Sequence, residues 1–420
     1  SERELFNCFY ISEYNDRHFT LSKGTPLSSL FKQKAEKKKD VLNTELIAEL
    51  GRHAKQGFED AIQDKELFQD VIDAITENAS HLGLQSTAVK ASIDQREFLL
   101  RENKIALHQE DNVPLRQLGK GSKRLLSLAI QLSLTEPSGI ILIDEIEQGL
   151  EPDRVQQITT FLRGRTSLQI ILTTHSNHVI QSLRTANIVI KKKDETEFKL
   201  IPSTIQGTII KHPGALFARK IIVAEGGTEW GFIQGMNEFR QSCSLPSFSF
   251  KGIVLIDGNG NECFQTTLAL SSLGYPVLLF CDSDKPNLED TKTSLRAKGV
   301  EIIDCEENLT FEHQIFKNCH WNSVKELINL RIESSGQNDK SIYNEIKQRF
   351  PSLPPYIETW QETENENLRQ AIGIDADKSK WFKSKELGKA VAKIILPYSN
   401  GIGGRLGQNL TSISKWLERI

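Results

Sequence analysis

The segment KIIVAEGGTE, residues 220–229, decides how the second half of the chain folds. The four apolar residues after Lys220 are typical of a strand buried on both faces, and the paired glycines permit a tight turn into a helix. Glu225 stands at the end of this strand, and Glu229 lies four residues further on, at the start of the helix. The two carboxylates are therefore expected to face one point in space.

A second pair of carboxylates follows the apolar run VLLFC at residues 277–281. Asp282 and Asp284 are two residues apart, and such side chains point the same way on an extended segment. Clustered carboxylate oxygens suit Mg²⁺ or Mn²⁺. Two such ions can activate water and stabilise the leaving oxygen of a phosphodiester. The two acidic pairs together predict a two-metal site for phosphodiester hydrolysis.

The remainder of this half predicts an α/β domain followed by a mostly helical region after Cys319. Helices fill the intervals between the apolar runs, an arrangement typical of a sheet covered on both faces. The chain is expected to divide into domains at 1–210 and 211–420. The expected strands of the second domain are 220–224, 253–256, 277–280 and 300–303.

The first half contains a second acidic strand end, IILIDE at residues 140–145. A buried strand would deliver Asp144 and Glu145 to the carboxyl edge of a sheet, where ligands bind in α/β folds. Asp144 suits the magnesium shell in phosphoryl transfer, and Glu145 suits the positioning of the attacking water. A further strand at 169–173 is followed by His175, which could reach a γ-phosphate.

Upstream of that strand, the segment LGKGSKR at residues 118–124 opens an apolar helix that is expected to follow Gly121. Gly119 and Gly121 permit a close backbone approach, and the free N–H groups at a helix start attract phosphate. Together with Ser122 they are predicted to contact nucleotide.

Other elements of the first half are expected from local patterns. Residues 9–11 predict a short strand, and the alternating residues of 88–108 predict a β-hairpin. Apolar residues at helical spacing predict helices over 27–78, and the segment 27–80 is a candidate dimerisation element.

The composition is that of an ordinary soluble protein, with 38% hydrophobic and 25% charged residues and a net charge of −3. The six cysteines form no CxxC pair and no zinc-type spacing. No signal peptide is visible in the sequence, and no apolar run approaches the roughly 20 residues that a membrane span requires. A cytoplasmic protein that does not enter a membrane is expected.

The order of the elements in the first half resembles the ATPase domain of the ABC/SMC/RecF class. By this resemblance residues 119–122 belong to the signature loop, Asp144 and Glu145 end the Walker B strand, and His175 is the switch histidine. The segment DEIEQGLEPDR, residues 144–154, resembles the Walker B and D-loop of OLD-family ATPases. The Walker A pattern Gly-x4-Gly-Lys-[Ser/Thr] does not occur in the sequence. Either an N-terminal segment that carries this pattern is missing from the chain, or the ATPase is degenerate. The missing segment is the expected explanation, and the chain by itself is then expected to have an incomplete ATP site and not to hydrolyse ATP.

The acidic half resembles the Toprim domain of topoisomerases, primases and OLD nucleases. An ABC-type ATPase followed by Toprim is similar to the OLD family, especially to its class 2 members, which include the nuclease subunit of the Gabija anti-phage system. The resemblance implies a further acid, best matched by Glu312, with Glu306 and Glu307 as competitors. It also implies a catalytic lysine, matched by Lys385, with Lys383 as the alternative.

The resemblance implies a metal-dependent DNA endonuclease coupled to an ATPase, acting in anti-phage defence as a homodimer or higher homo-oligomer. A helicase-like partner of the Gabija kind is a further expectation. Nine Lys or Arg residues against three acids between 377 and 420 predict a DNA-binding track there. The alternatives are a non-catalytic ATP-gated scaffold or sensor, and a Toprim enzyme that cleaves RNA.

Overall fold

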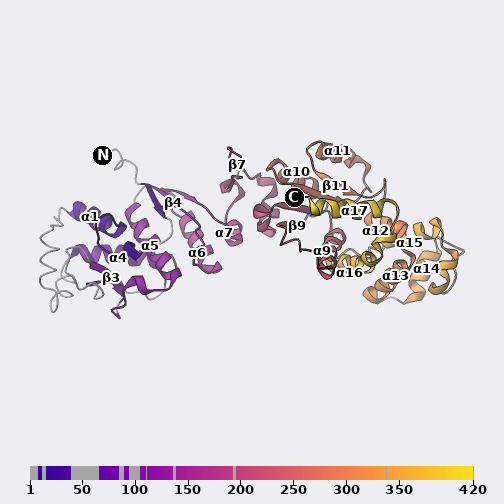
Figure 1. Ribbon diagram of the computed structural model, residues 1–420, viewed down its shortest axis with the longest axis horizontal. Coiled ribbons are helices and arrows are strands. Elements are labelled where there is room, and N and C mark those ends of the chain that lie inside the picture. The colour runs from indigo at the N-terminus through magenta and orange to yellow at the C-terminus, as the bar shows by residue number, and fades with distance from the viewer. Residues whose placement is uncertain are drawn as a thin grey trace. The chain divides into compact units, whose positions relative to one another are not determined.

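The computed structural model divides the chain into two compact units, unit 1 (Ser1–Ser182) and unit 2 (Leu183–Ile420). The division precedes the boundary expected near residue 211. The intervening segment contacts unit 2, since Lys192 donates a hydrogen bond to the carbonyl oxygen of Gly274. The structure describes residues 8–11, 16–38, 66–84, 89–93, 105–109, 111–135, 139–192, 195–336 and 338–419 (Figure 1).

Unit 1 is built on a parallel sheet with the strand order β1-β4-β5. Its strands are β1 (Cys8–Ile11), β4 (Gly139–Ile143) and β5 (Leu168–Leu172). These confirm the strands expected at 9–11, 140–143 and 169–173. The expected hairpin is confirmed as well, as the antiparallel pair β2 (Val89–Ile93) and β3 (Ile105–Gln109).

The helices of unit 1 surround α5, whose residues from Arg124 to Thr135 are all buried. α5 contacts α1, α4 and β4, so an apolar helix lies at the centre of the unit. Of the helical segment expected over 27–78, residues 39–65 lie outside the described residues. The helices and 3-10 turns are η2 (Asp16–Phe19), α1 (Pro26–Lys38), α4 (Glu66–His81), η3 (Leu115–Gln117), α5 (Lys120–Thr135), α6 (Pro152–Arg163) and α7 (Asn177–Ser182).

Unit 2 contains a parallel sheet with the strand order β11-β10-β8-β9. The expected strands are confirmed, with the last one shifted by a residue. In Figure 1, α10 and α11 are drawn on one side of these strands and α9 and α16 on the other. The strands and crossover helices are β8 (Lys220–Ala224), α9 (Gly227–Ser242), β9 (Ile253–Asp257), α10 (Glu262–Ser272), β10 (Val277–Cys281), η7 (Pro286–Leu288), α11 (Glu289–Ala297) and β11 (Glu301–Asp304).

The rest of unit 2 is a lead-in segment and a helical C-terminal region, which confirms the expectation for residues after Cys319. The lead-in contains η4 (Thr185–Asn187), β6 (Val189–Ile190), β7 (Lys199–Leu200), η5 (Ser203–Ile205), α8 (Gln206–Lys211) and η6 (Pro213–Phe217). The C-terminal region contains α12 (Phe311–Asn318), α13 (Trp321–Ser335), α14 (Asp339–Lys347), η8 (Ile357–Thr363), α15 (Glu366–Lys378), α16 (Lys385–Ile395), η9 (Leu396–Gly401) and α17 (Gly404–Glu418). None of the described helices is both long and apolar enough to cross a membrane.

α9 and α16 approach each other so closely that glycine is required at their contact. A Cβ atom on Gly231 would lie 2.1 Å from the carbonyl oxygen of Lys385, and one on Gly388 would lie 2.3 Å from that of Thr228. A Cβ atom on Gly235 would lie 2.5 Å from the Cβ of Ala392. Small residues four apart thus let the two backbones touch. This contact joins the helix after β8 to the residues that precede α16.

Candidate functional site

The first of two clusters of acidic and polar side chains lies in unit 1, at the carboxyl ends of β4 and β5. The Thr173 hydroxyl donates to Oδ1 of Asp144 at 2.5 Å and accepts the backbone N–H of Glu145 at 2.9 Å. Arg124 of α5 donates to the carbonyl oxygen of Asp144 at 2.6 Å. Glu145 has a φ of +44°, a left-handed conformation that non-glycine residues rarely adopt. Partners from two other elements therefore hold the turn that carries both predicted acids.

Glu147, which the sequence interpretation did not single out, ties this turn to the end of β5. Its carboxylate accepts a hydrogen bond from the Thr174 hydroxyl at 2.7 Å and from the backbone N–H of His175 at 2.5 Å. Glu147 is the third acid of the DEIE pattern, so the sequence contained a signal for it. The structure thus brings His175 to the same sheet edge as Asp144.

The glycine segment before α5 also reaches this edge. α5 begins at Lys120, two residues before the start that the sequence predicted, so Gly121 and Ser122 lie in its first turn. A Cβ atom on Gly121 would lie 2.8 Å from the carbonyl oxygen of Gly149. By contrast, a Cβ on Gly119 would meet nothing within 4 Å. Packing against the acidic turn therefore explains the glycine at 121.

The second cluster lies at the carboxyl ends of β8 and β10, which are neighbours in the sheet of unit 2. The backbone N–H of Asp282 donates to Oε2 of Glu225 at 3.0 Å. Oδ1 of Asp282 accepts the N–H of Phe311, the first residue of α12, at 2.7 Å. Strand pairing thus joins the first acid of each predicted pair.

Glu229 and Glu312 are buried within this second cluster, with exposed fractions of 3% and 0%. The hydroxyl of Thr228 donates to Oε1 of Glu312 at 3.0 Å. Nζ of Lys383 lies 3.2 Å from each carboxylate oxygen of Glu312. Oε1 of Glu229 is buried and has no hydrogen-bond partner within the described part of the chain. We call Glu225, Glu229, Asp282, Glu312 and Lys383 the carboxylate cluster.

The buried charges of the carboxylate cluster shift one another's pKa values. Burial, and then the charge of Glu312, raises the pKa of Glu229 to about 7. Burial, and then the charges of Glu229 and Glu312, raises the pKa of Asp282 well above its usual value. Burial alone would lower the pKa of Lys383, but the three carboxylates outweigh it and raise that pKa. The ammoniums of Lys383 and of Lys285, which lies 3.9 Å from Oε1 of Glu225, do not balance the four acids, so the cluster favours an added proton or cation.

The structure places the two candidate lysines differently. Lys385 does not join the carboxylate cluster: its Nζ lies 2.7 Å from Oδ2 of Asp257 and 4.6 Å from the ring centre of Trp230. Lys383, the alternative, occupies the place beside Glu312. The reason is the helix start, since Ser384 caps α16 and Lys385 is already its first residue.

The other predicted acids also divide into those inside the carboxylate cluster and those outside it. Among the three candidates after β11, Glu312 lies in the carboxylate cluster, whereas Glu306 pairs with Lys317 at 2.6 Å and Glu307 is exposed. Asp284 is exposed, whereas Asp282 is partly buried. The structure therefore places Asp284 in contact with solvent rather than inside the cluster.

A buried lysine that the sequence interpretation missed supports the Asp282 loop. Lys292 of α11 is 1% exposed and donates to the carbonyl oxygen of Asp282 at 3.0 Å and to the hydroxyl of Ser283 at 2.9 Å. It also lies 3.4 Å from Asp304 at the end of β11. Its spacing of three from Leu295, on the buried side of α11, was the available signal.

The basic segment 377–420 is less available for nucleic acid than its composition indicated. Six of its nine Lys and Arg residues form ion pairs inside unit 2, with Glu238, Asp257, Glu301, Asp304 or Glu312 as partners. Much of the expected track is therefore already neutralised by neighbouring acids.

No metal-ligand group of three or more His, Cys, Asp or Glu side chains is already arranged among the described residues. Asp282 and Glu312 instead turn oxygens towards the Phe311 N–H, the Thr228 hydroxyl and Lys383. The partnerless oxygen of Glu229 and the excess of carboxylates fit a divalent cation, whose preferred ligands are such oxygens. Side-chain rotation at the cluster would have to accompany its binding.

Replacing Glu229 with glutamine is expected to stabilise the metal-free protein at pH 8. Because the folded-state pKa of about 7 exceeds the ordinary 4.5, the folded chain binds this proton more tightly than the unfolded chain does. The free energy of unfolding therefore falls as the pH rises from about 4.5 to 7, by on the order of 3 kcal/mol. Glutamine cannot ionise, so the free energy of unfolding of the variant should not fall in this way as the pH rises.

Urea unfolding in EDTA, followed by tryptophan fluorescence, measures the effect. All five tryptophans lie in unit 2, so the signal reports on that unit. The free energy of unfolding of the variant should exceed that of wild type at pH 8. The difference between the two free energies should become smaller as the pH falls towards 5. A difference that is the same at both pH values would contradict the assigned pKa.

Comparison with known proteins identifies the ATPase part. Residues 24–181 match the family described as "AAA domain, putative AbiEii toxin, Type IV TA system". This segment, which includes Asp144, Glu145 and His175, is an AAA-type ATPase domain, a class that uses ATP with Mg²⁺. No curated protein matches the chain.

Among solved structures, a crystal structure of the SmcHead bound to the C-winged helix domain of ScpA matches with 15% identity and a TM-score of 0.27. The match covers 42% of this chain and 49% of that one, so this chain spans about half of its length. A likeness this weak carries no argument.

Proposed function

We propose that unit 2 is a metal-dependent DNA endonuclease of the Toprim type, coupled to the ATPase domain of unit 1. The observation that carries the proposal is that the buried acids Glu229 and Glu312 and the partly buried Asp282 lie together beside the ammonium of Lys383. Buried acids that outnumber their cationic partners destabilise a fold. Strongly shifted pKa values of this kind gather at functional sites.

Mg²⁺ or Mn²⁺ would be held by oxygens of Glu225, Glu229, Asp282, Asp284 and Glu312. Such ions, when bound, supply an activated water and stabilise charge on the leaving oxygen of a phosphodiester. The exposed position of Asp284 supports this assignment, because an outer ligand must remain within reach of substrate.

The chain's own groups would carry the rest of the reaction. The ammonium of Lys383 is placed to stabilise the negative charge that develops on the scissile phosphate. Thr228 holds Glu312 in position through the hydrogen bond to Oε1. Glu229, with a pKa of about 7, can accept a proton at Oε1 near neutral pH.

Control by the ATPase domain is part of the proposal. Asp144 would hold the magnesium shell, Glu145 would position the attacking water, and His175 would sense the γ-phosphate. Gly119, Gly121 and Ser122 would contact nucleotide held by another copy, which makes a homodimer or a larger homo-oligomer the expected state. The helicase-like partner and the role in anti-phage defence rest on the OLD-family resemblance.

A second candidate is a non-catalytic, ATP-gated scaffold or sensor. It is favoured by the protein donors that already satisfy oxygens of Asp282 and Glu312. The third possibility, an enzyme that cleaves RNA, differs only in substrate. Both alternatives are separated from the first by the same assay, the conversion of supercoiled plasmid to nicked or linear DNA with Mg²⁺ or Mn²⁺.

Lys383→Gln is expected to slow plasmid cleavage about a hundredfold, as does the loss of one preorganised charge-stabilising group. Lys385→Gln, a matched loss of charge two residues away, should change the rate no more than about threefold, because its ammonium is committed to Asp257. The cleavage rates of both variants are measured as initial rates by gel densitometry, with Mg²⁺, with Mn²⁺ and, as a metal-free reference, in EDTA.

The folding control is the double variant Glu312→Gln/Lys383→Gln, which removes both charges of the Glu312–Lys383 ion pair together. It should regain the urea stability that Lys383→Gln loses, without regaining cleavage. Equal rates for wild type and Lys383→Gln would overturn the assignment of this lysine. A wild-type protein that cuts no DNA with either metal supports the scaffold, and cleavage of RNA alone supports the third possibility.

A further inference from the structure

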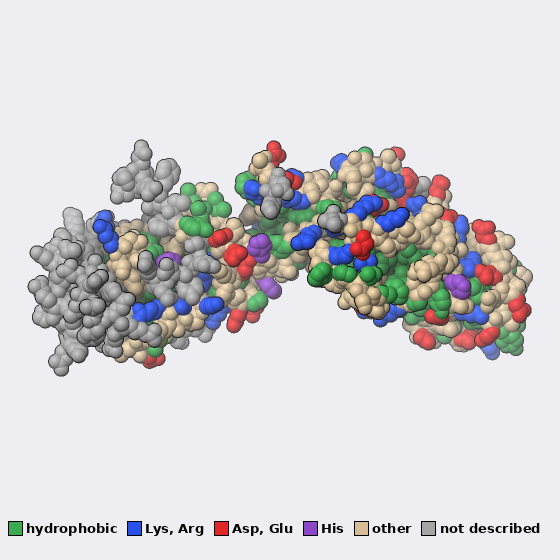
Figure 2. All heavy atoms as spheres, in the orientation of Figure 1, with side chains coloured by type: hydrophobic (Ala, Val, Ile, Leu, Met, Phe, Trp, Pro, Cys, Tyr) green, Lys and Arg blue, Asp and Glu red, His purple; other side chains and the backbone are tan. Residues whose placement is uncertain are grey.

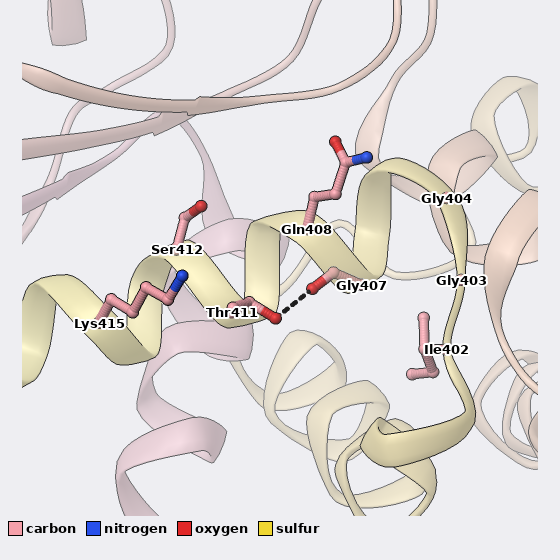
Figure 3. A pocket seen from close by; sticks show the side chains of 8 residues that line it. All are labelled: Ile402, Gly403, Gly404, Gly407, Gln408, Thr411, Ser412 and Lys415. Carbon is pink, nitrogen blue, oxygen red and sulfur yellow. Dashed lines mark hydrogen bonds between the residues drawn. The ribbon is translucent and has the colours of Figure 1, made fainter.

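A polar groove runs along α17 on the surface of unit 2, with a volume of about 470 Å³. Figure 3 shows Gln408, Ser412 and Lys415 extending from the same side of the helix. None of the lining residues belongs to the carboxylate cluster. The lining includes Gly403, Gly404, Gln408, Thr411, Ser412 and Lys415.

Cations gather where α17 ends. Lys220 donates to the carbonyl oxygen of Trp416 at 3.0 Å, and Lys251 to that of Leu417 at 3.2 Å. Five cations and two acids, Glu301 and Glu418, lie around this end, and Arg219 is the chain neighbour of one of the five, Lys220. Figure 2 shows Lys and Arg side chains gathered over the region that Figure 1 labels α17. The six, which we call the cation cluster, are Arg219, Lys220, Arg240, Lys251, Lys415 and Arg419.

The acids around the cation cluster neutralise it only in part, since Arg240 and Lys251 share the single carboxylate of Glu418. Lys415 and Arg219 are exposed and have no acidic partner within the described part of the chain. Arg419 pairs with Glu301, yet 60% of its side chain is exposed. Burial, and then the like charges of Lys251 and Arg419, lowers the pKa of Lys220. The excess of positive charge on this surface favours binding of an anionic partner.

α17 connects two edges of the sheet in unit 2. Near its start, Nε of Arg405 donates to the carbonyl oxygen of Asp304, at the carboxyl end of β11, at 3.1 Å. At its end, Arg419 lies 2.9 Å from Glu301, the first residue of β11. The 15 residues of α17 span about 22 Å at 1.5 Å per residue. The groove therefore leads away from the edge that carries the carboxylate cluster.

We propose that the α17 groove and the cation cluster bind the sugar-phosphate backbone of DNA as it leaves the carboxylate cluster. This inference rests on the proposed nuclease function and names the path of its substrate. The charge of the surface is complementary to phosphate, and amide, hydroxyl and ammonium donors line it at helical spacing. Over about 22 Å, one strand of a duplex presents roughly six phosphates at 3.4 Å each.

Contacts of this kind fix the position of DNA without reading its sequence. Each neutralised phosphate releases counterions, so affinity depends steeply on salt, with a slope of about −0.9 per contact. Lys415 lines the groove in the last turn of α17, and Arg419 is the residue that caps the end of this helix. Removing both charges should therefore change the salt slope as well as the affinity.

The test compares Lys415→Gln/Arg419→Gln with wild type and with Lys340→Gln/Lys347→Gln, which removes two exposed lysines from α14, outside the basic segment 377–420. Binding to a fluorescein-labelled DNA duplex is measured by anisotropy in EDTA between 50 and 200 mM salt. The first variant should bind about tenfold more weakly at 50 mM, with a salt slope shallower by roughly two. The matched control should follow wild type.

The result can be separated from the fate of the nuclease proposal. If the wild type binds DNA in this way and the variant does not, while neither cuts, the DNA path stands and the nuclease fails. If wild type cuts DNA and the variant binds as tightly and as steeply with salt as the control, the path is overturned. Binding of an RNA duplex but not of DNA also overturns it. Equal urea midpoints for both variants exclude unfolding as the cause of weak binding.

Discussion

Asp282→Asn is expected to lower the rate of metal-dependent DNA cleavage about a thousandfold, which corresponds to about 4 kcal/mol of transition-state stabilisation. Asp282 connects the end of β8 to the start of α12. Its backbone N–H donates to the carboxylate of Glu225, and its own carboxylate accepts a hydrogen bond from the N–H of Phe311. Asparagine keeps an oxygen for the Phe311 N–H but loses the negative charge that would hold a cation. Single-turnover rates on plasmid with saturating Mn²⁺ measure the loss.

Two comparisons make this result interpretable. Because burial beside Glu229 and Glu312 raises the pKa of Asp282, its ionised form destabilises the fold, so the metal-free variant should be at least as stable as wild type at pH 8. Glu307→Gln removes the same charge from an exposed neighbouring position and should cut at the wild-type rate. Cleavage by Asp282→Asn at the wild-type rate would leave the nuclease proposal without its central residue.

Gly231→Ala is expected to destabilise unit 2 by about 3 kcal/mol, at the upper end of the usual cost of overpacking. The added methyl carbon would lie 2.1 Å from the carbonyl oxygen of Lys385 and 2.8 Å from the backbone nitrogen of Lys389. Both are main-chain atoms of α16, so relief requires a shift of the whole helix. Such a shift would also move Lys383, and cleavage should fall with stability.

The matched control is Gly207→Ala in α8, where an added methyl group would meet nothing within 4 Å. Alanine loses less backbone entropy than glycine, so this change should be neutral or stabilising by up to about 1 kcal/mol. Urea unfolding followed by tryptophan fluorescence compares both variants with wild type. Equal free energies of unfolding for Gly231→Ala and wild type would show that α9 and α16 are not packed as described.

Local patterns were sufficient for the strands and for the first acids of the site. A run of apolar residues such as 277–281 makes a buried strand wherever it lies, and the residue that follows it must emerge at the carboxyl edge. Glu225 and Asp282 could therefore be predicted to meet once both strands were assigned to one parallel sheet. Glu229 followed from its position in the first turn of the next helix.

Local patterns could not predict which basic side chains are free to bind DNA. The count of nine basic residues in 377–420 was correct, but their partners, such as Glu238 and Asp304, come from distant elements. The sequence also gave no reason to join Lys220 and Lys251 to the end of α17, because neighbours across a sheet edge share no periodicity. Electrostatic surfaces depend on which charges packing brings together.

By itself, the sequence determined two α/β patterns, each with acids at strand ends, because strand burial and turn chemistry are encoded by residues close in the chain. Only the tertiary structure decided that Lys383 rather than Lys385 faces Glu312, and that Lys292 supports the Asp282 loop. Those choices depend on how α9, α16 and α11 pack. Helix packing is set by contacts such as Gly231 against the backbone of Lys385, between residues too far apart in the chain for any local pattern to encode.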